Sequence, residues 1–126
     1  MNKDKILDNI FLPRKTNFFE NSPHSFISVE DGVEVSYCSY IKNKSYDNII
    51  FFHGNAELAC EYNQIATFYN DLRINLIVAD YRGYGFSGGS PTKENLLTDS
   101  CKVFEHIKDN LIARGFNGKK IIMGRS

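Results

Sequence analysis

Hydrophobic positions recur along the chain with two periods, and the change between them outlines the secondary structure. Phe26 to Glu30 and Val33 to Ile41 alternate apolar and polar residues around Asp31-Gly32, which predicts a β-hairpin. Three later segments are short apolar runs, which are typical of strands buried on both faces of a sheet. These runs are Asn48 to His53, Leu76 to Asp80 and Lys119 to Met123.

Two segments between the runs carry apolar residues at helical spacing. The first extends from Glu57 to Leu72, and its apolar face is predicted to contain Leu58, Tyr62, Ile65, Tyr69 and Leu72. The second follows Thr92, a residue type that caps helix N-termini, has Glu94 in its first turn and ends at Gly115. Its apolar face is predicted to contain Leu97, Cys101, Phe104, Ile107 and Leu111.

A hairpin followed by strand, helix, strand, helix and strand predicts an α/β domain with a largely parallel sheet. We expect a partial domain at residues 24–126 and an irregular segment at residues 1–23, where Pro13 and Pro23 interrupt the chain. The strand at 119–123 comes last, so we expect it to have a neighbour on one side only and one sheet face to be partly bare.

Charge and composition exclude several classes of function. The 15 Lys and Arg residues balance 15 Asp and Glu residues, so no basic surface for nucleic acid is expected. The longest apolar run, Ile49 to Phe52, is far shorter than the roughly 20 residues that span a bilayer. The polar N-terminus leads into no secretory signal. We therefore expect a cytoplasmic protein without a membrane span, although peripheral membrane association is compatible with the sequence.

No cofactor is expected either. The three cysteines, Cys38, Cys60 and Cys101, lack C-x-x-C spacing, so they fit buried, reduced thiols better than a zinc site or a disulfide framework. The glycine-rich loop before Pro91 lacks the G-x-G-x-x-G and G-K-[ST] patterns of nucleotide sites. Its glycines instead suit a loop with positive φ angles. These glycines are at positions 83, 85, 88 and 89.

Three motifs each follow directly on a predicted buried strand. They are His53-Gly54-Asn55-Ala56, Asp80-Tyr81-Arg82-Gly83-Tyr84-Gly85 and Gly124-Arg125-Ser126. In sheets of this type ligands bind at the carboxyl ends of the strands. The order and placement of the motifs therefore predict one site at that edge of the sheet.

The motifs resemble those of the α/β-hydrolases. Phe51 to Glu57 is similar to the H-G-N-A segment after the third strand of that fold, and Asp80 to Pro91 to the D-Y-R-G-Y-G-x-S-x-G-x-P loop after the fourth. Gly124 to Ser126 matches the first half of the G-x-S-x-G nucleophile elbow. The resemblance implies the N-terminal half of an α/β-hydrolase sheet, truncated at the elbow. The subgroup resembled includes protein depalmitoylases and serine aminopeptidase-like esterases.

The resemblance assigns roles to individual residues. Ser126 is the expected nucleophile, and the backbone N–H of Asn55, or alternatively of Ala56, is an expected oxyanion donor. His53 precedes Ser126, whereas the triad order is Ser, acid, His, so His53 is expected to brace the oxyanion loop through its ring nitrogens. Further support is expected from close turning at Gly54, from Gly124 as the first elbow glycine, and from a charge network of Asp80, Arg82 and Arg125.

The function implied is a serine hydrolase that cleaves an ester, thioester or amide bond of a small-molecule or acylated substrate through an acyl-enzyme, without a metal. The chain contains no triad acid or base after Ser126, so we expect it to be inactive alone. The alternative from a different class is a catalytically inactive, truncated remnant or a non-enzymatic binding fragment.

Overall fold

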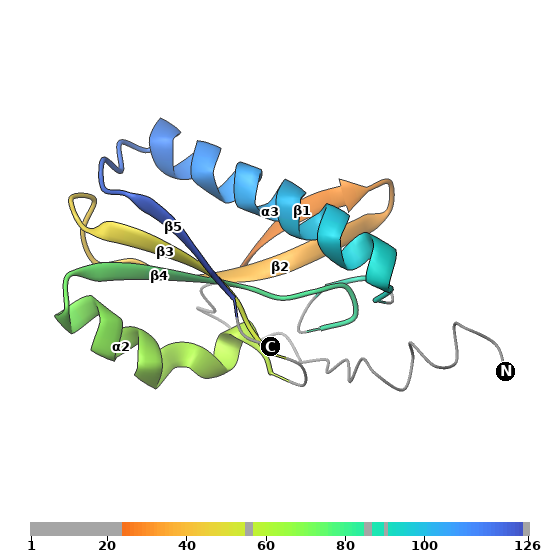
Figure 1. The fold of residues 1–126 in the computed structure, drawn as a ribbon, viewed down its shortest axis with the longest axis horizontal. Helices are drawn as coiled ribbons and strands as arrows, with labels where there is room; N and C mark the ends of the chain where they lie inside the picture. Colours follow the sequence, from red (N-terminus) through yellow and green to blue (C-terminus); the bar gives the residue numbers. More distant parts are fainter. Residues whose placement is uncertain (1–23, 55–56, 85–86, 90, 125–126) are drawn as a thin grey trace, which may run out of the picture.

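A five-stranded mixed sheet forms the centre of the computed structural model, which describes residues 24–54, 57–84, 87–89 and 91–124. The strands are β1 (His24–Glu30), β2 (Val33–Tyr40), β3 (Asp47–Phe52), β4 (Ile74–Ala79) and β5 (Lys120–Gly124). Their order across the sheet is β1-β2-β4-β3-β5 (Figure 1). The predicted hairpin and the three later strands are confirmed, whereas the expected segment at 1–23 lies outside the described residues.

Strands β3, β4 and β5 run parallel, and the hairpin is added antiparallel to β4. The register aligns the ends of all three parallel strands, because Phe52 pairs with both Ala79 and Gly124. The motifs that follow these strands therefore start from one edge of the sheet. The prediction of an α/β fold with an incomplete, largely parallel sheet is confirmed.

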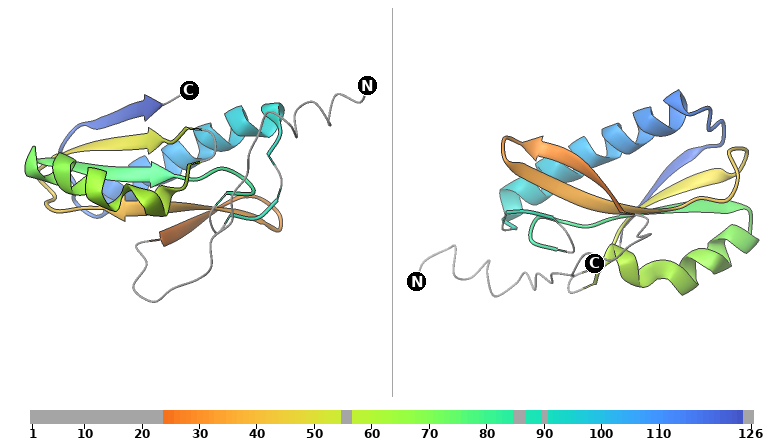
Figure 2. Two further views of the ribbon diagram at one scale, coloured as in Figure 1. Left: turned by 90° about the horizontal axis from the view of Figure 1, so that it is seen from below. Right: turned by 180° about the vertical axis from the view of Figure 1, so that it is seen from behind.

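Helix α3 (Lys93–Ala113) covers one face of the sheet, and η1 (Ala59–Tyr62) and α2 (Asn63–Asp71) cover the other (Figures 1 and 2). The two-residue period of the strands divides the core between these faces. Ile50 and Ile77 pack on the α3 side, whereas Phe51 and Val78 pack on the α2 side. Each strand end is thereby held between two apolar layers.

The inward faces of both helices match the predicted ones only in part: Leu58, Tyr62, Ile107 and Leu111 are buried as predicted, and other positions differ. In α2 the buried residue is Ala66, whereas Ile65 and Leu72 are 47% and 60% exposed. In α3 the buried apolar residues are Val103, Ile107 and Leu111. Leu97 is 73% exposed, and Cys101 is exposed as well, which also corrects the prediction that every cysteine is buried.

Helix α3 begins and ends where the sequence predicts. The Thr92 side chain accepts a hydrogen bond from the Asn95 backbone, and the Asn95 side chain accepts one from the Thr92 backbone. This reciprocal pair is a capping box, and it fixes where the helix begins. Gly115 ends the helix with a φ of +83°, a left-handed conformation that costs glycine little.

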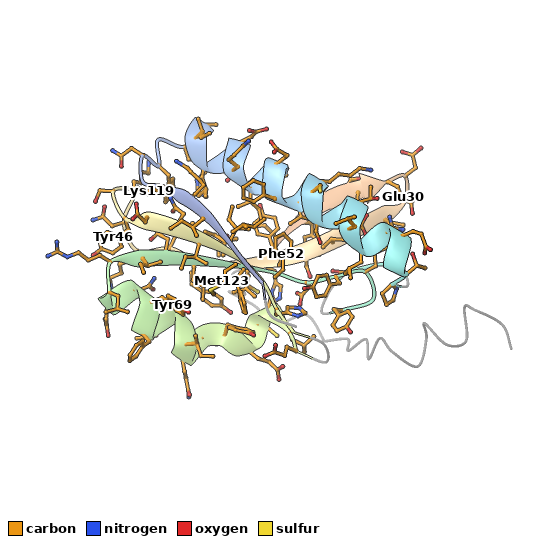
Figure 3. All side chains as sticks on the ribbon, in the orientation of Figure 1. Glu30, Tyr46, Phe52, Tyr69, Lys119 and Met123 are labelled. Carbon is orange, nitrogen blue, oxygen red and sulfur yellow. The ribbon has the colours of Figure 1, made fainter. Side chains whose placement is uncertain are left out.

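Loops at the edge opposite the motifs approach each other closely. The backbone of Asn48 donates to the Lys119 carbonyl at 2.7 Å, and Figure 3 shows Tyr46 and Lys119 in the two adjacent loops. A Cβ on Gly118 would lie 2.0 Å from the Tyr46 carbonyl oxygen. Only glycine fits between these two backbone segments.

Gly118→Ala is therefore expected to destabilise the fold by about 3 kcal/mol, the upper range for overpacking, because backbone atoms must separate. Urea denaturation of the full-length protein measures this change. Gly88→Ala is the matched control, since its Cβ would lie 3.9 Å from the nearest atoms. Equal stabilities of the two variants would contradict the prediction.

Strand β5 has a paired neighbour on one side only in the described part of the chain, as expected. Ile121 and Ile122 on this strand are 43% and 58% exposed. On the α2 face, Tyr69 and Met123 line an apolar groove of about 310 Å³ between helix and strand (Figure 3). The expected partly bare sheet face therefore lies beside β5.

Candidate active site at the carboxyl ends of the parallel strands

A buried pair of titratable side chains joins the ends of β3 and β4. The Nε2 atom of His53 lies 2.8 Å from Oδ1 of Asp80, and both side chains are fully buried. This contact follows from the register, because the two residues come directly after the paired Phe52 and Ala79. This distance is that of a hydrogen bond between the two side chains.

The other ring nitrogen of His53 faces its own loop. Nδ1 lies 2.9 Å from the carbonyl oxygen of Gly54. A carbonyl oxygen only accepts, so Nδ1 carries the hydrogen and donates it. Both ring nitrogens are therefore occupied.

Asp80 is the centre of a larger polar cluster. Its Oδ1 also accepts from the backbone N–H of Ala59 at 2.9 Å, and its Oδ2 accepts from the Ser36 hydroxyl at 3.0 Å. The backbone N–H of Ser36 donates to the Ser87 hydroxyl oxygen at 2.9 Å. The cluster therefore connects the ends of β3 and β4, the hairpin, the start of η1 and the loop after β4.

Tight turns in the loop after β4 support this cluster. Gly83 and Gly89 have φ angles of +80° and +70°, as the sequence predicts, but Gly88 does not adopt a positive φ. The Gly88 backbone donates instead to the Glu34 carbonyl of β2 at 2.8 Å. Gly85 lies outside the described residues.

Side chains from outside the first motif form hydrogen bonds with the backbone of His53 and Gly54. The Tyr81 hydroxyl donates to the His53 carbonyl at 2.7 Å, and burial raises the pKa of Tyr81 to about 12, so the hydroxyl keeps its proton at neutral pH. The backbone N–H of Gly54 donates to Oε1 of Glu57 at 2.5 Å. The other Glu57 oxygen accepts from the Tyr62 hydroxyl at 2.8 Å.

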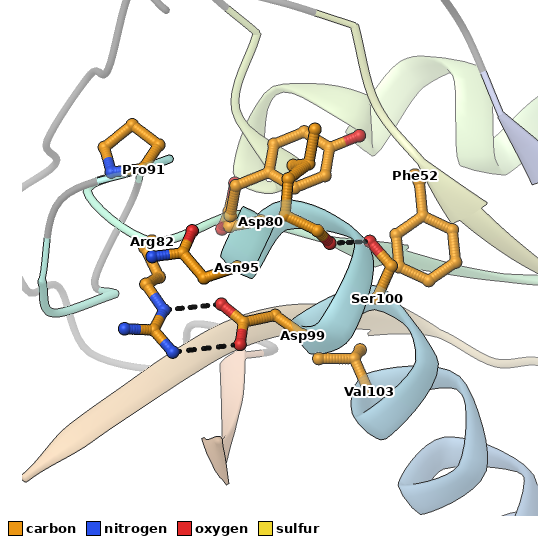
Figure 4. A pocket seen from close by; sticks show the side chains of 10 residues that line it. Phe52, Asp80, Arg82, Pro91, Asn95, Asp99, Ser100 and Val103 are labelled. Carbon is orange, nitrogen blue, oxygen red and sulfur yellow. Dashed lines mark hydrogen bonds and ion pairs between the residues drawn. The ribbon is translucent and has the colours of Figure 1, made fainter. Parts of the chain in front are cut away.

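The predicted charge network is wrong in its partners. Arg82 does not pair with Asp80 but forms two hydrogen bonds with Asp99 of α3, at 2.6 and 3.0 Å (Figure 4), and contacts Glu30. These carboxylates raise the pKa of Arg82, which is charged in any case. The pair fastens the loop after β4 to α3, beside a cavity of only about 10 Å³.

The structure brings together only some of the predicted site residues. His53, Gly54 and Asp80 meet at one edge, and Gly124 ends the neighbouring strand at the same level. Asn55, Ala56, Arg125 and Ser126 lie outside the described residues. Four further members of the site, Ser36, Ser87, Glu57 and Tyr81, were not predicted, although the last three lie within or beside the motifs.

Two types of site are absent from the described parts of the chain. They contain no group of three or more His, Cys, Asp or Glu side chains that could hold a metal ion. None of the helices described combines the length and hydrophobicity that a bilayer-spanning segment requires.

Three parallel strands between helices, with a polar cluster at their carboxyl ends, define an α/β protein with its candidate site at that edge. No protein-family model matches the chain. It is 33% identical over 84 residues to Protein bem46 of Schizosaccharomyces pombe, a match that covers 66% of this chain and 27% of bem46. It is 35% identical over 69 residues to human α/β hydrolase domain-containing protein 17B, covering 49% of this chain and 23% of that protein.

Solved structures agree on the fold. The Pyrococcus furiosus esterase Pf2001 superposes with a TM-score of 0.65 at 22% identity, over 90% of this chain and 47% of that one. The chain thus spans about a quarter of the curated relatives and about half of this esterase. It carries the N-terminal portion of an α/β-hydrolase domain, the domain after which human protein 17B is named and the fold that it shares with this esterase.

Proposed function

We propose that this chain is part of a serine hydrolase that cleaves an ester, thioester or amide bond through an acyl-enzyme on Ser126. The observation that carries the proposal is the register of β3 and β5, in which Phe52 pairs with Gly124. The residues that continue from these neighbouring strand ends are His53-Gly54-Asn55 and Arg125-Ser126. Acyl transfer needs a nucleophile and an oxyanion donor on adjacent segments, which this register provides for.

In the proposed mechanism the Ser126 hydroxyl attacks the substrate carbonyl and gives its proton to a general base. The scissile bond then breaks, the alcohol, thiol or amine leaves with that proton, and water hydrolyses the acyl-enzyme to release the acid and restore the serine. The oxyanion that forms accepts hydrogen bonds from the backbone N–H of Asn55 and from that of the residue after Ser126. The general base is a histidine later in the full-length protein, oriented by an acid that also follows Ser126. His53 does not fill that role, because both of its ring nitrogens are engaged by Gly54 and Asp80.

Support for hydrolysis of an acyl substrate comes from the neighbours in fold, among them an esterase. In the described part of the chain, the groove beside β5 is lined mainly by apolar side chains, which are compatible with many acyl groups. The proposal therefore stays at the class of ester, thioester and amide substrates.

A fluorophosphonate probe tests this function on the full-length protein that contains residues 1–126. We expect a single covalent adduct, which peptide mass spectrometry locates at Ser126, and no adduct in Ser126→Ala. Ser28→Ala, which changes an exposed serine of β1, is the matched control and should be labelled like the wild type. A folded wild-type protein that reacts elsewhere, or not at all, would overturn the proposal and favour a non-catalytic binding role.

A further inference from the structure

We infer that Asn117-Gly118, in the loop between α3 and β5, is a site of spontaneous deamidation, and that its isoaspartyl product weakens the pairing of β5 with β3. The reaction requires no enzyme and no cofactor. The inference is independent of the proposed function, because the loop lies at the start of β5, whereas the candidate site lies at the carboxyl ends of the strands.

The sequence provides the first step. In deamidation the backbone nitrogen of the following residue attacks the side-chain amide carbon of asparagine, and a Cβ on the following residue obstructs this approach. Glycine has no Cβ, so the obstruction is absent at Gly118. Asn117 is the only asparagine in the sequence that precedes a glycine. It is therefore the position at which ring closure is sterically easiest.

Both reacting groups are accessible in the structure. The Asn117 side chain is exposed, and within the described part of the chain neither its amide nor the backbone N–H of Gly118 has a hydrogen-bond partner. The Asn117 backbone donates to the Lys44 carbonyl at 3.2 Å, which holds the main chain but not the side chain. The side-chain amide can therefore turn toward the nitrogen of Gly118.

A positive charge lies beside the reacting peptide group. The Lys120 ammonium donates to the Phe116 carbonyl at 2.7 Å and to the Gly118 carbonyl at 2.8 Å, so it spans the peptide that joins Asn117 to Gly118. The attacking species is the Gly118 nitrogen after loss of its proton. A neighbouring cation favours such an anionic form. The charge and the missing Cβ thus promote the same step.

The reaction balances with water as the sole co-reactant. The Gly118 nitrogen forms a bond to Cγ of Asn117, the Cγ–Nδ2 bond breaks, and ammonia leaves with the proton that the Gly118 nitrogen gives up. The product is a cyclic succinimide. Water that opens the ring at Cγ gives aspartate, whereas water that opens it at the main-chain carbonyl gives isoaspartate. In isoaspartate the main chain continues through Cβ and Cγ.

The isoaspartyl product does not fit the space around Gly118. It lengthens the main chain by one methylene group and leaves a carboxylate beside it. Gly118 is packed so closely against Tyr46 that a Cβ would lie 2.0 Å from the Tyr46 carbonyl oxygen. A longer chain therefore has to move Gly118 away from Tyr46, as the same lack of space makes additional atoms unfavourable.

The displacement reaches the sheet through the next residue. The Lys119 backbone donates to Oδ1 of Asp47 at 2.9 Å, and the Lys119 carbonyl accepts from the backbone of Asn48 at 2.7 Å. These two bonds lie where β5 begins to pair with β3 (Figure 3). Movement of Gly118 strains both bonds, so isoaspartate at position 117 weakens the attachment of β5.

Prolonged incubation of the folded full-length protein at mildly alkaline pH, followed by peptide mass spectrometry, tests the chemistry. We expect the peptide that contains Asn117 to show the mass of an acid in place of an amide, and protein isoaspartate methyltransferase to methylate it. Asn110, an exposed asparagine of α3 that precedes Leu111, is the internal control and should remain an amide. Asn117→Gln should remain unmodified, because its longer side chain closes a larger ring more slowly.

Thermal unfolding of the incubated protein tests the structural effect. The isoaspartyl fraction is expected to unfold at a Tm lower by roughly 5 °C, because a close contact between backbone segments is lost. Asn117→Asp is the matched variant, since it introduces the carboxylate without lengthening the main chain, and it should keep the Tm of the fresh wild type.

The two measurements can each overturn the inference. Asn117 that remains an amide in the folded protein would refute the site, even if the same protein deamidates in urea. Isoaspartate at position 117 with an unchanged Tm would refute its effect on β5, and so would an equal loss of Tm in Asn117→Asp. Deamidation confined to Asn117, with a lower Tm for the isoaspartyl form alone, supports the inference.

Discussion

Ser126→Ala is expected to lower kcat of the full-length protein by about 10⁶-fold, the loss seen when a hydrolase loses its nucleophilic serine. In the proposed mechanism the Ser126 hydroxyl forms the acyl-enzyme, and no neighbouring residue is expected to replace it. The residual rate reflects substrate binding and oxyanion stabilisation alone. Steady-state hydrolysis of a p-nitrophenyl ester measures the change.

The same variant should unfold at the wild-type temperature, because the substitution removes one hydroxyl from a segment that follows β5. Wild-type stability would show that the lost rate is a loss of chemistry rather than of fold. A decrease in kcat smaller than about tenfold would contradict the assignment of Ser126 as nucleophile.

Asp80→Ala is expected to lower the free energy of unfolding by about 3–5 kcal/mol, the range for removing one partner of a buried ion pair. The substitution leaves three donors without their acceptor, from His53, Ala59 and Ser36. All lie in the interior, where water cannot take the place of the carboxylate without cost. Urea denaturation of the full-length protein gives the free energy.

Asp80→Asn removes the charge but keeps the shape and one acceptor oxygen. Its free energy of unfolding should therefore fall by less than that of Asp80→Ala. Asp109→Ala, at an exposed position of α3, is the surface control and should change stability by less than about 0.5 kcal/mol. Asp80→Ala and Asp109→Ala with the same stability would contradict the role of Asp80 as the centre of the cluster.

The succession of strands and helices along the chain, and the common sheet edge from which the motifs start, could be predicted because each depends on local patterns. Apolar runs mark strands buried on both faces, and motifs that follow parallel strands must start from the same edge. The N-cap of α3 at Thr92 and the end of the helix at Gly115 also depend on local sequence, and both predictions are confirmed. What these features share is independence from distant residues.

The faces of the helices could not be predicted from spacing, because small and polar residues occupy part of the inward side. Ala66 lets α2 approach the sheet, and this turns Ile65 outward. On α3, Asp99 is buried because Arg82 neutralises it. A prediction from hydrophobic periodicity places Asp99 on the solvent-facing side of α3. The predicted apolar face is therefore rotated toward Leu97.

The polar partners at the site could not be predicted from the sequence either, because they depend on side-chain directions and on contacts between distant residues. Proximity in the chain suggested a pair between Asp80 and Arg82, but both residues follow the end of β4, where the two-residue alternation of a strand no longer sets the side-chain directions. Asp80 points into the interior toward His53, and Arg82 points toward α3. Ser36, which is 44 residues before Asp80, could be assigned to the cluster only from three-dimensional structure.

The cluster around Asp80 also bears on the order in which the protein is made. Its members, from Ser36 to Ser87, all precede α3 and β5 in the chain, and the strands that carry them include the pair β2 and β4 at the middle of the sheet. Synthesis is vectorial, but a domain generally folds as a unit. The cluster around Asp80 is thus translated ahead of Ser126, but we expect it to form only once the rest of the domain has been made.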